Sequence, residues 1–216
     1  MKVASVVGAR PNFIKVAAVH GAISSISEHV IIHTGQHYDY RLSEIFFKEF
    51  GLPKPNFQLE VGSGRPVIQI GEMLKRLQRI FTEGNKFDVV LVYGDTNSTF
   101  AGAFCAAKSG IKVAHVEAGL RSFDRRMPEE TNRILTDHLS DYLFAPTSTA
   151  VKNLKREHVN GRVVLSGDVS VEIVKRAVSE LVPRSHILKR LQLNEHNTSY
   201  ILLTIHRAEN TCSEDK

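Results

Sequence analysis

Residues 89–99 read Val-Val-Leu-Val-Tyr-Gly-Asp-Thr-Asn-Ser-Thr. An unbroken apolar run ends at a glycine, and a polar turn follows at once. Such a run is typical of a strand buried on both faces of a parallel sheet. Thr96 and the polar residues after it favour the start of a helix. The stretch therefore predicts a strand that leads directly into a helix.

The same alternation extends along the chain in both directions. Short β-branched runs alternate with amphipathic segments, which predicts βαβ units and a parallel sheet with helices on both faces. The expected strands are residues 2–7, 29–34, 57–61, 87–93, 112–117, 142–145 and 162–166, and the expected helices begin near Pro11, Arg41, Arg65, Thr96, Pro128 and Ser148. We therefore expect an α/β fold, with a doubly wound, Rossmann-like domain at residues 1–168.

One expected helix has a clear apolar periodicity. Its apolar residues recur at steps of three and four, at Val67, Ile70, Leu74, Leu77 and Phe81. This spacing predicts a single stripe that faces the core rather than a partner.

The alternation changes after Gly167. Residues 169–182 predict a helix that Pro183 ends, a second short helix runs to about Leu193, and residues 200–205 predict the first strand of a new sheet. A single strand cannot bury its own faces. We therefore expect residues 169–216 to be the helices and first strand of a second domain that is cut short at Lys216.

Charge and composition narrow the class of protein. The net charge is +5, 42% of the residues are hydrophobic and 24% are charged, which suits a globular protein. The cations are scattered and tryptophan is absent, so we expect a phosphate-bearing small molecule rather than nucleic acid. Cys105 and Cys212 form no metal or disulfide pattern. With no signal peptide and no membrane-spanning run, a cytoplasmic location is expected.

The first expected strand ends at Gly8-Ala9-Arg10-Pro11, where a helix begins. The free amides of a helix start, with Arg10 and Lys15 beside them, predict an anion site. The stretch is not a GxGxxG motif, so a nicotinamide site is not indicated. Alternatively, Arg10 closes the loop and Lys15 is an ordinary solvated residue.

Two acidic residues end neighbouring strands. If the strands that precede Asp95 and Glu117 are parallel neighbours, they lie about 4.8 Å apart and their carboxylates meet at one sheet edge. Carboxylates so close shift each other's proton affinity, which suits acid–base catalysis. The alternative for Asp95 is a cap on the helix at Thr96.

Other polar residues lie where ligands bind in such sheets. Glu129 and Glu130 follow Pro128 in the first turn of a helix, and stabilisation by the helix dipole alone would explain both. Gln36 and His37 lie in a polar loop that could be only a turn. His206 and Arg207 follow the last apolar run and are candidates for an anion site. His115, inside a strand, is expected to be packed.

Six stretches, taken together, resemble the non-hydrolysing UDP-N-acetylglucosamine 2-epimerases, with wording closer to archaeal members than to enterobacterial ones. They are VVGARPNFIK (6–15), HTGQHYD (33–39), VVLVYGDTNST (89–99), VAHVEAGLRSFDRRMPEETNRILTD (113–137), LFAPTSTAVKNL (143–154) and LLTIHRAEN (202–210). They occur in the family's order and spacing over the whole chain.

The resemblance implies the front half of a glycosyltransferase-B-type two-domain fold, with the nucleotide bound mainly by the second domain. It implies interconversion of UDP-N-acetylglucosamine and UDP-N-acetylmannosamine by elimination and re-addition of UDP, with no redox cofactor and no metal, in a homodimer. The implied catalytic residues are Asp95, Glu117, Glu129 and His206. Arg10, Lys15 and Arg207 would bind substrate, and Gln36 and His37 match a loop that binds an activating UDP-sugar in bacterial members.

Two other functions stay open on the sequence alone. A hydrolysing epimerase would use the same carboxylates and release free N-acetylmannosamine, because water would end the reaction. The other alternative is a domain that binds a nucleotide without catalysis, and the incomplete C-terminal domain favours it. We expect this chain by itself to be inactive or nearly so.

Overall fold

The computed structural model describes residues 1–36, 47–193 and 199–205. Within these ranges seven strands form one sheet in the order β3-β2-β1-β4-β5-β6-β7, and every neighbouring pair is parallel. The strands are β1 (Lys2–Val7), β2 (Glu28–His33), β3 (Phe57–Gln58), β4 (Val89–Tyr93), β5 (Lys112–Val116), β6 (Tyr142–Ala145) and β7 (Arg162–Leu165). The expected doubly wound α/β fold is confirmed.

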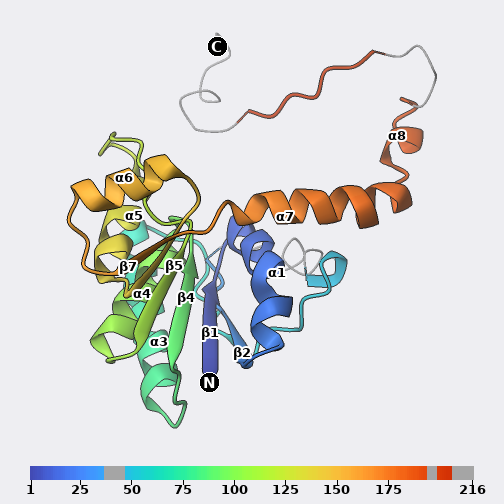
Figure 1. The fold of residues 1–216 in the computed structure, drawn as a ribbon. Helices are drawn as coiled ribbons and strands as arrows, with labels where there is room; N and C mark the ends of the chain where they lie inside the picture. Colours follow the sequence, from blue (N-terminus) through green and yellow to red (C-terminus); the bar gives the residue numbers. More distant parts are fainter. Residues whose placement is uncertain (37–46, 194–198, 206–216) are drawn as a thin grey trace. The chain divides into compact units, whose positions relative to one another are not determined.

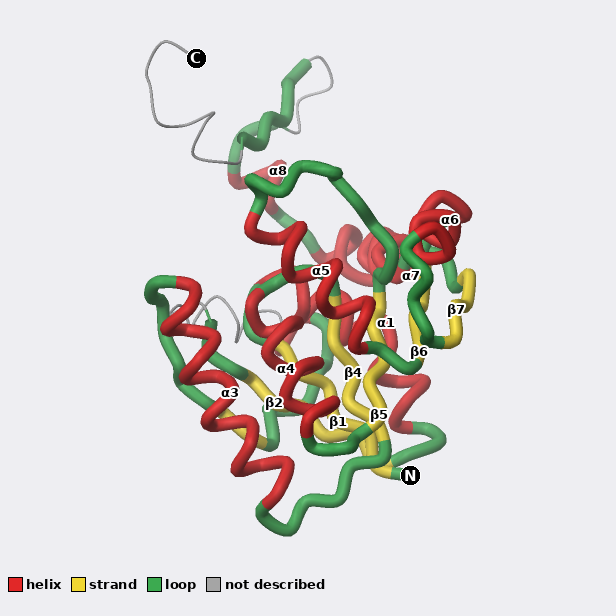
Figure 2. The backbone as a smooth tube through the Cα atoms, turned by 90° about the vertical axis from the view of Figure 1, so that its left-hand side faces the viewer, coloured by secondary structure: helices red, strands yellow, loops and turns green. Residues whose placement is uncertain are grey.

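The helices form two layers on the sheet. They are α1 (Arg10–Ser24), α3 (Pro66–Thr82), α4 (Asn97–Lys108), α5 (Pro128–Leu139) and α6 (Ser148–Arg156). Figures 1 and 2 show α1 on one face and α3, α4 and α5 on the other. The chain runs outward from β1 to β3 and then returns past β1 to β4. Because crossovers are right-handed, this reversal of direction moves the helices to the opposite face.

Helix α3 packs on a hydrophobic core cluster, but its buried face differs in part from the predicted stripe. Met73, Leu77 and Phe81 are buried there, and Ile70 and Leu74 pack at its margin. Val67 was expected in this core and is 80% exposed. It lies in the first turn of α3, and the inward position of that turn belongs to Gln69, one turn before Met73. The prediction for Val67 was therefore wrong.

The strand order places a topological switch point between β1 and β4. These strands pair with each other, yet their chains continue in opposite directions across the sheet, through α1 to β2 and through α4 to β5. All strands are parallel, so the loops after β1, β4 and β5 leave from the same edge. Open α/β sheets bind ligands in the crevice at this point.

The later part of the chain was predicted less well. By internal contacts the chain divides into two units, Met1–Lys175 and Arg176–Lys216. Helix α7 (Val169–Arg176) continues as a π-helical turn (Ala177–Leu181) and a 3₁₀ turn (Val182–Arg184), and α8 spans Ile187–Arg190. The change from α-helical hydrogen bonds begins before Pro183. Proline has no N–H, and its ring clashes with the carbonyl four residues earlier in an α-helix.

The strand expected at residues 200–205 is absent, and that prediction was wrong. These residues have no regular secondary structure, and Ile201 is 93% exposed. A strand requires a partner strand, and the described sheet consists of β1–β7 without residues 200–205. Among all residues that the structure describes, no helix is both long and apolar enough to cross a bilayer.

Candidate active site

Lys15 and Glu117 meet at the switch point. Lys15 lies on α1, Glu117 follows directly after β5, and the Lys15 ammonium forms an ion pair with the Glu117 carboxylate. Their side chains are only 13% and 19% exposed. Gly94, after β4, leaves the room for this pair: a Cβ there would lie 2.8 Å from Lys15 Nζ, and the backbone has φ +66°. The glycine in the Tyr-Gly-Asp turn is therefore required by both conformation and space.

Asp95, the residue after Gly94, has a cation of its own. Its carboxylate accepts a hydrogen bond from Arg133 of α5, and Arg133 also donates to Glu130 Oε2 at 2.8 Å. The helix cap is Thr96, whose hydroxyl accepts a hydrogen bond from the Thr99 amide at 3.3 Å. The capping interpretation of Asp95 is therefore wrong, and its carboxylate is directed to the ion pair.

Several charges act on Lys15. Burial lowers the pKa of Lys15, the negative charges of Asp95 and Asp168 act against this and raise it, and Arg133 lowers it. Asp168 follows β7 and also accepts a hydrogen bond from the Ser170 amide at 2.8 Å, at the start of α7. Asp168 was not among the residues predicted from the sequence. The site thus alternates acidic and basic groups, which suits the stabilisation of charge that develops during a reaction.

The two glutamates at the start of α5 differ in environment. Glu130 is buried and accepts hydrogen bonds from the amides of Ser122 and Phe123, both at 3.0 Å. Burial alone would raise the pKa of Glu130, but these hydrogen bonds and the charge of Arg133 lower it below its usual value. Glu129 is exposed, and its carboxylate makes no hydrogen bond within the described ranges. Glu130 therefore has a structural role, whereas Glu129 is available to a ligand.

The start of α1 offers fewer free amides than expected. The Asn12 side-chain oxygen accepts from the amides of Gly8 and Ala9, at 3.2 and 3.1 Å. The backbone amide of Asn12 donates to the Ala9 carbonyl, and Pro11 has no N–H. An anion at this helix start would therefore depend chiefly on the exposed Arg10 side chain.

Gln36 contacts the start of α4. Its side-chain oxygen accepts hydrogen bonds from the Ser98 amide at 3.0 Å and the Ser98 hydroxyl at 2.7 Å. This oxygen therefore accepts a hydrogen bond from a backbone amide at the N-terminus of α4. His37, His206 and Arg207, which the sequence analysis selected, lie outside the described residues.

Two residues of α5 that organise the site were not predicted from the sequence. Arg133 pairs with Asp95, and Asn132 donates to the Asp95 carbonyl at 2.9 Å and to Asn97 Oδ1 at 3.1 Å. Their spacing was a usable signal, because residues three and four positions after Glu129 lie on its face of the helix.

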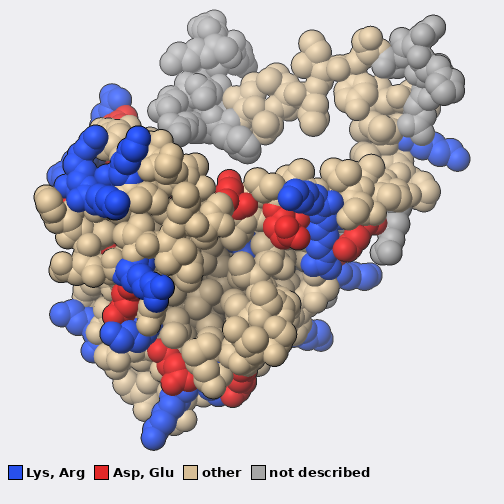
Figure 3. All heavy atoms as spheres, viewed as in Figure 1, with Lys and Arg blue, Asp and Glu red and all other residues tan. Residues whose placement is uncertain are grey.

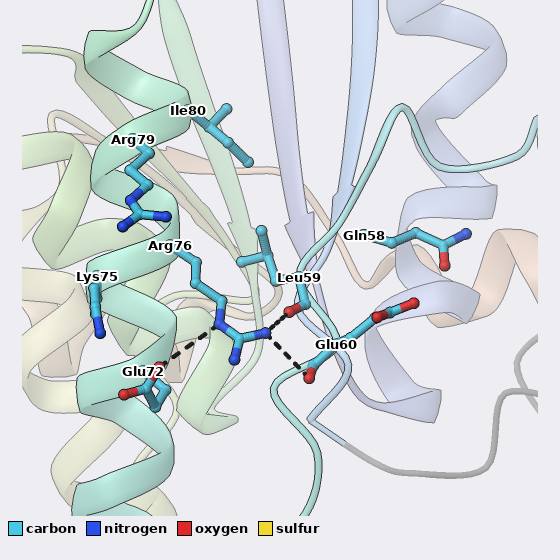
Figure 4. A pocket seen from close by; sticks show the side chains of 8 residues that line it. All are labelled: Gln58, Leu59, Glu60, Glu72, Lys75, Arg76, Arg79 and Ile80. Atoms are coloured by element: carbon cyan, nitrogen blue, oxygen red, sulfur yellow. Dashed lines mark hydrogen bonds and ion pairs between the residues drawn. The ribbon is translucent and has the colours of Figure 1, made fainter.

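A different hollow lies between the end of β3 and α3, away from these residues. Figure 4 shows its basic side chains, Lys75, Arg76 and Arg79, along α3. The Arg76 guanidinium donates to the Leu59 carbonyl, and it pairs with Glu72 at 3.7 Å. None of the selected residues lines this hollow.

Among the described residues, neither the charges on the face seen in Figure 3 nor the potential metal ligands indicate a second site. On the face seen in Figure 3 the largest group of cations lies over α6, and the others are interspersed with acidic side chains. Within the described ranges no three His, Cys, Asp or Glu side chains are grouped so that they could hold a metal ion.

Comparisons with known proteins agree on one family. The family model described as UDP-N-acetylglucosamine 2-epimerase matches residues 22–216. A "UDP-N-acetylglucosamine 2-epimerase homolog" of Methanococcus maripaludis is 52% identical over 98% of this chain and 58% of the relative. A UDP-2,3-diacetamido-2,3-dideoxy-D-glucuronate 2-epimerase of Pseudomonas aeruginosa is 45% identical over 98% of this chain and 59% of the relative.

Solved structures give the same result. The crystal structure of Methanocaldococcus jannaschii UDP-GlcNAc 2-epimerase in complex with UDP-GlcNAc and UDP matches with a TM-score of 0.90 and 43% identity, over 100% of this chain and 59% of that one. The chain thus spans less than two thirds of the length of the relatives it matches.

Proposed function

Since this chain belongs to the UDP-N-acetylglucosamine 2-epimerase family, we propose that its protein interconverts UDP-N-acetylglucosamine and UDP-N-acetylmannosamine at C2 of the sugar. One observation carries the proposal: the Lys15–Glu117 and Asp95–Arg133 pairs lie at the switch point of a doubly wound sheet. The M. jannaschii relative crystallised with UDP-GlcNAc and UDP supports it.

The proposed reaction avoids direct ionisation of a weakly acidic hydrogen. A base removes the proton from C2 as the C1–O bond to UDP breaks, which gives 2-acetamidoglucal and UDP. Protonation of C2 on the opposite face and return of UDP to C1 then give the epimer. This route requires proton-transfer groups on both sides of the sugar and cations that stabilise the departing diphosphate.

The described side chains suit those roles. We assign proton transfer to the carboxylates of Asp95, Glu117 and Glu129. Lys15 would stabilise the negative charge of Glu117 through their ion pair and contact the sugar or diphosphate, and the exposed Arg10 would bind the diphosphate. For His206 and Arg207, the family resemblance supports a catalytic and a substrate-binding role respectively.

A second substrate has a specific observation in its favour. The P. aeruginosa relative, 45% identical to this chain, is named for a diacetamido-glucuronate nucleotide. The same elimination could act on that sugar, whose additional carboxylate would require one more cation in the site. Parallel assays with both nucleotide sugars separate the two substrates.

Proton NMR in heavy water tests the reaction directly. The full-length gene product that carries this chain is incubated with UDP-N-acetylglucosamine. Deuterium at C2, together with signals of UDP-N-acetylmannosamine, is the expected result. Free N-acetylmannosamine and UDP as the sole products would identify a hydrolysing epimerase. An unchanged substrate that nevertheless binds would favour a non-catalytic domain.

The remaining properties of the protein are proposed on resemblance. Gln36 and His37 would bind a second, activating UDP-sugar; hyperbolic kinetics with no lag would contradict this. The hydrogen bonds from Ser98 involve the Gln36 side-chain oxygen and not its amide nitrogen. We further propose a cytoplasmic homodimer with no nucleic-acid or membrane partner. Sedimentation of the full-length protein tests the dimer.

A further inference from the structure

A buried histidine joins the two loops that carry the candidate carboxylates. His115 lies on β5 and is fully buried. Its Nε2 is 2.7 Å from the Gly94 carbonyl, next to Asp95, and its Nδ1 is 2.7 Å from Asp137 Oδ1. His115 therefore bonds on one side to the loop of Asp95 and on the other side to α5.

Asp137 extends this connection to the loop of Glu117. Its second oxygen accepts a hydrogen bond from the Gly119 amide at 3.1 Å, two residues after Glu117. The same oxygen pairs with Arg121 Nη1 at 2.8 Å, and Arg121 also pairs with Glu157. Because Asp137 is itself fully buried, this geometry has little freedom to change.

The charges of the network are consistent with these hydrogen bonds. Burial alone would raise the pKa of Asp137, but the positive charges of His115 and Arg121 lower it below its usual value. The Gly94 carbonyl can only accept a hydrogen bond, so His115 Nε2 donates to it, and the Asp137 carboxylate accepts hydrogen bonds from its partners. Charge-assisted bonds of this kind are stronger than neutral ones.

The backbone at Glu117 requires such support. Glu117 has φ +75°, in the left-handed region that is unfavourable for a non-glycine residue and persists only where the surroundings enforce it. The amides of Glu117 and Ala118 donate to the Phe144 carbonyl at 3.1 and 3.0 Å, and Asp137 holds the Gly119 amide. Together these bonds enforce the conformation that directs Glu117 toward Lys15.

We propose that His115 and Asp137 are positioning residues, which hold the loops of Asp95 and Glu117 at the separation that catalysis requires. This inference rests on the proposed epimerase function. Neither residue would contact the substrate, because both are fully buried. Their loss should therefore lower kcat, through misplacement of the carboxylates, much more than it changes KM.

Three variants of the full-length protein test the proposal. His115→Gln can place an amide donor near the position of Nε2 and keeps the bond to Gly94, whereas His115→Asn can keep the bond to Asp137. Asp137→Asn removes one of the charge-assisted contacts. For each folded variant we expect kcat to fall on the order of 10- to 100-fold, with KM changed less than about threefold.

Two matched controls lie away from the carboxyl edge. His29→Asn removes another histidine that bonds within the sheet, to Ser5 Oγ at 2.7 Å. Asp141→Asn removes another aspartate that holds a β5 amide, that of Val113 at 2.9 Å. Both controls should lower the melting temperature and leave kcat within about twofold of wild type.

The outcomes separate the two proposals. An active wild type whose Asp137→Asn and His115→Gln variants keep kcat within about twofold overturns the positioning role, even if their melting temperatures fall. Equal kcat losses in the variants and the controls overturn it as well. If Asp137→Asn does not fold, the two His115 variants decide. A wild type that converts no nucleotide sugar overturns the proposed function, and the positioning role with it.

Discussion

Lys15 on α1 and Glu117 after β5 form an ion pair although they lie 102 residues apart in the sequence. In the sheet only β4 lies between β1 and β5, and Gly94, directly after β4, has no side chain to separate the pair. The pair thus depends on three separate strand ends at one edge. The charges of the Asp95–Arg133 pair act on Lys15, and this second pair depends on the position of α5, which carries Arg133.

The ion pair should be measurable as a coupling energy. Lys15→Met leaves the mostly buried Glu117 carboxylate without its cation, so we expect a loss of about 1–3 kcal/mol in unfolding free energy. Glu117→Gln should lower kcat at least about 100-fold, because a proton-transfer group is lost. A double-mutant cycle measured by urea unfolding should give a coupling above about 1 kcal/mol; a value near zero would contradict the pair.

Asp95→Asn should separate catalysis from stability. Since Thr96 caps α4, the loss of the Asp95 charge should lower unfolding free energy by no more than about 1 kcal/mol. Turnover should fall at least about 100-fold. The matched control is Thr96→Ala, which should cost about 1 kcal/mol of stability through the lost cap and keep most of the activity. Full turnover by Asp95→Asn would exclude a catalytic carboxylate at this position.

Two glycine substitutions should have opposite effects on stability. Gly119 has φ +81°, and a Cβ there would lie 2.5 Å from the Ala150 carbonyl oxygen, so Gly119→Ala should cost at least about 2 kcal/mol. Gly21 lies inside α1 and a Cβ there meets nothing within 4 Å, so Gly21→Ala should add about 0.5–1 kcal/mol. Thermal melts of both variants test these two predictions. A Gly119→Ala protein as stable as wild type would refute the close approach of Gly119 to the Ala150 carbonyl oxygen.

His29 should make stability depend on pH. Burial, assisted by the positive charge of His20, lowers the pKa of His29 from 6.5 to about 4. Between these values the unfolded chain binds a proton that the folded chain does not, so stability is lost as pH falls from 6.5 toward 4. Relative to His29→Gln, the wild type should lose about 1–2 kcal/mol between pH 7 and pH 5.

Urea unfolding at the two pH values measures this difference. Titrating groups that do not contact His29 contribute equally to both proteins, so the comparison isolates His29 together with its partner His20. Equal losses in the wild type and in His29→Gln would show that the ring is not held neutral by the fold.

The sequence predicted the sheet well where the signal is local. The run at residues 89–93 and the glycine after it indicate a buried strand and its end, and strands β1 and β6 were predicted with their observed bounds. The run at residues 200–205 is similarly apolar and forms no strand, because a strand requires pairing with another strand, which an apolar composition does not specify.

The sequence predicted which residues belong to the candidate site, but not which of them pair with one another. Strand-end position was enough to select Asp95, Glu117 and Lys15. It could not separate Glu129 from Glu130, since both occupy the same first turn. Only the folded loop shows that the Ser122 and Phe123 amides bind Glu130 and leave Glu129 exposed.

By itself, the sequence determined the alternation of strands and helices, and which acidic and basic residues follow a strand, because hydrophobic periodicity and turn residues act over a few neighbouring positions. The tertiary structure alone decided that Arg133 pairs with Asp95, that Thr96 rather than Asp95 caps α4, and that His115 and Asp137 join the two loops. These contacts depend on strand order and helix packing, which bring together residues far apart in the chain, and no local pattern encodes their partners.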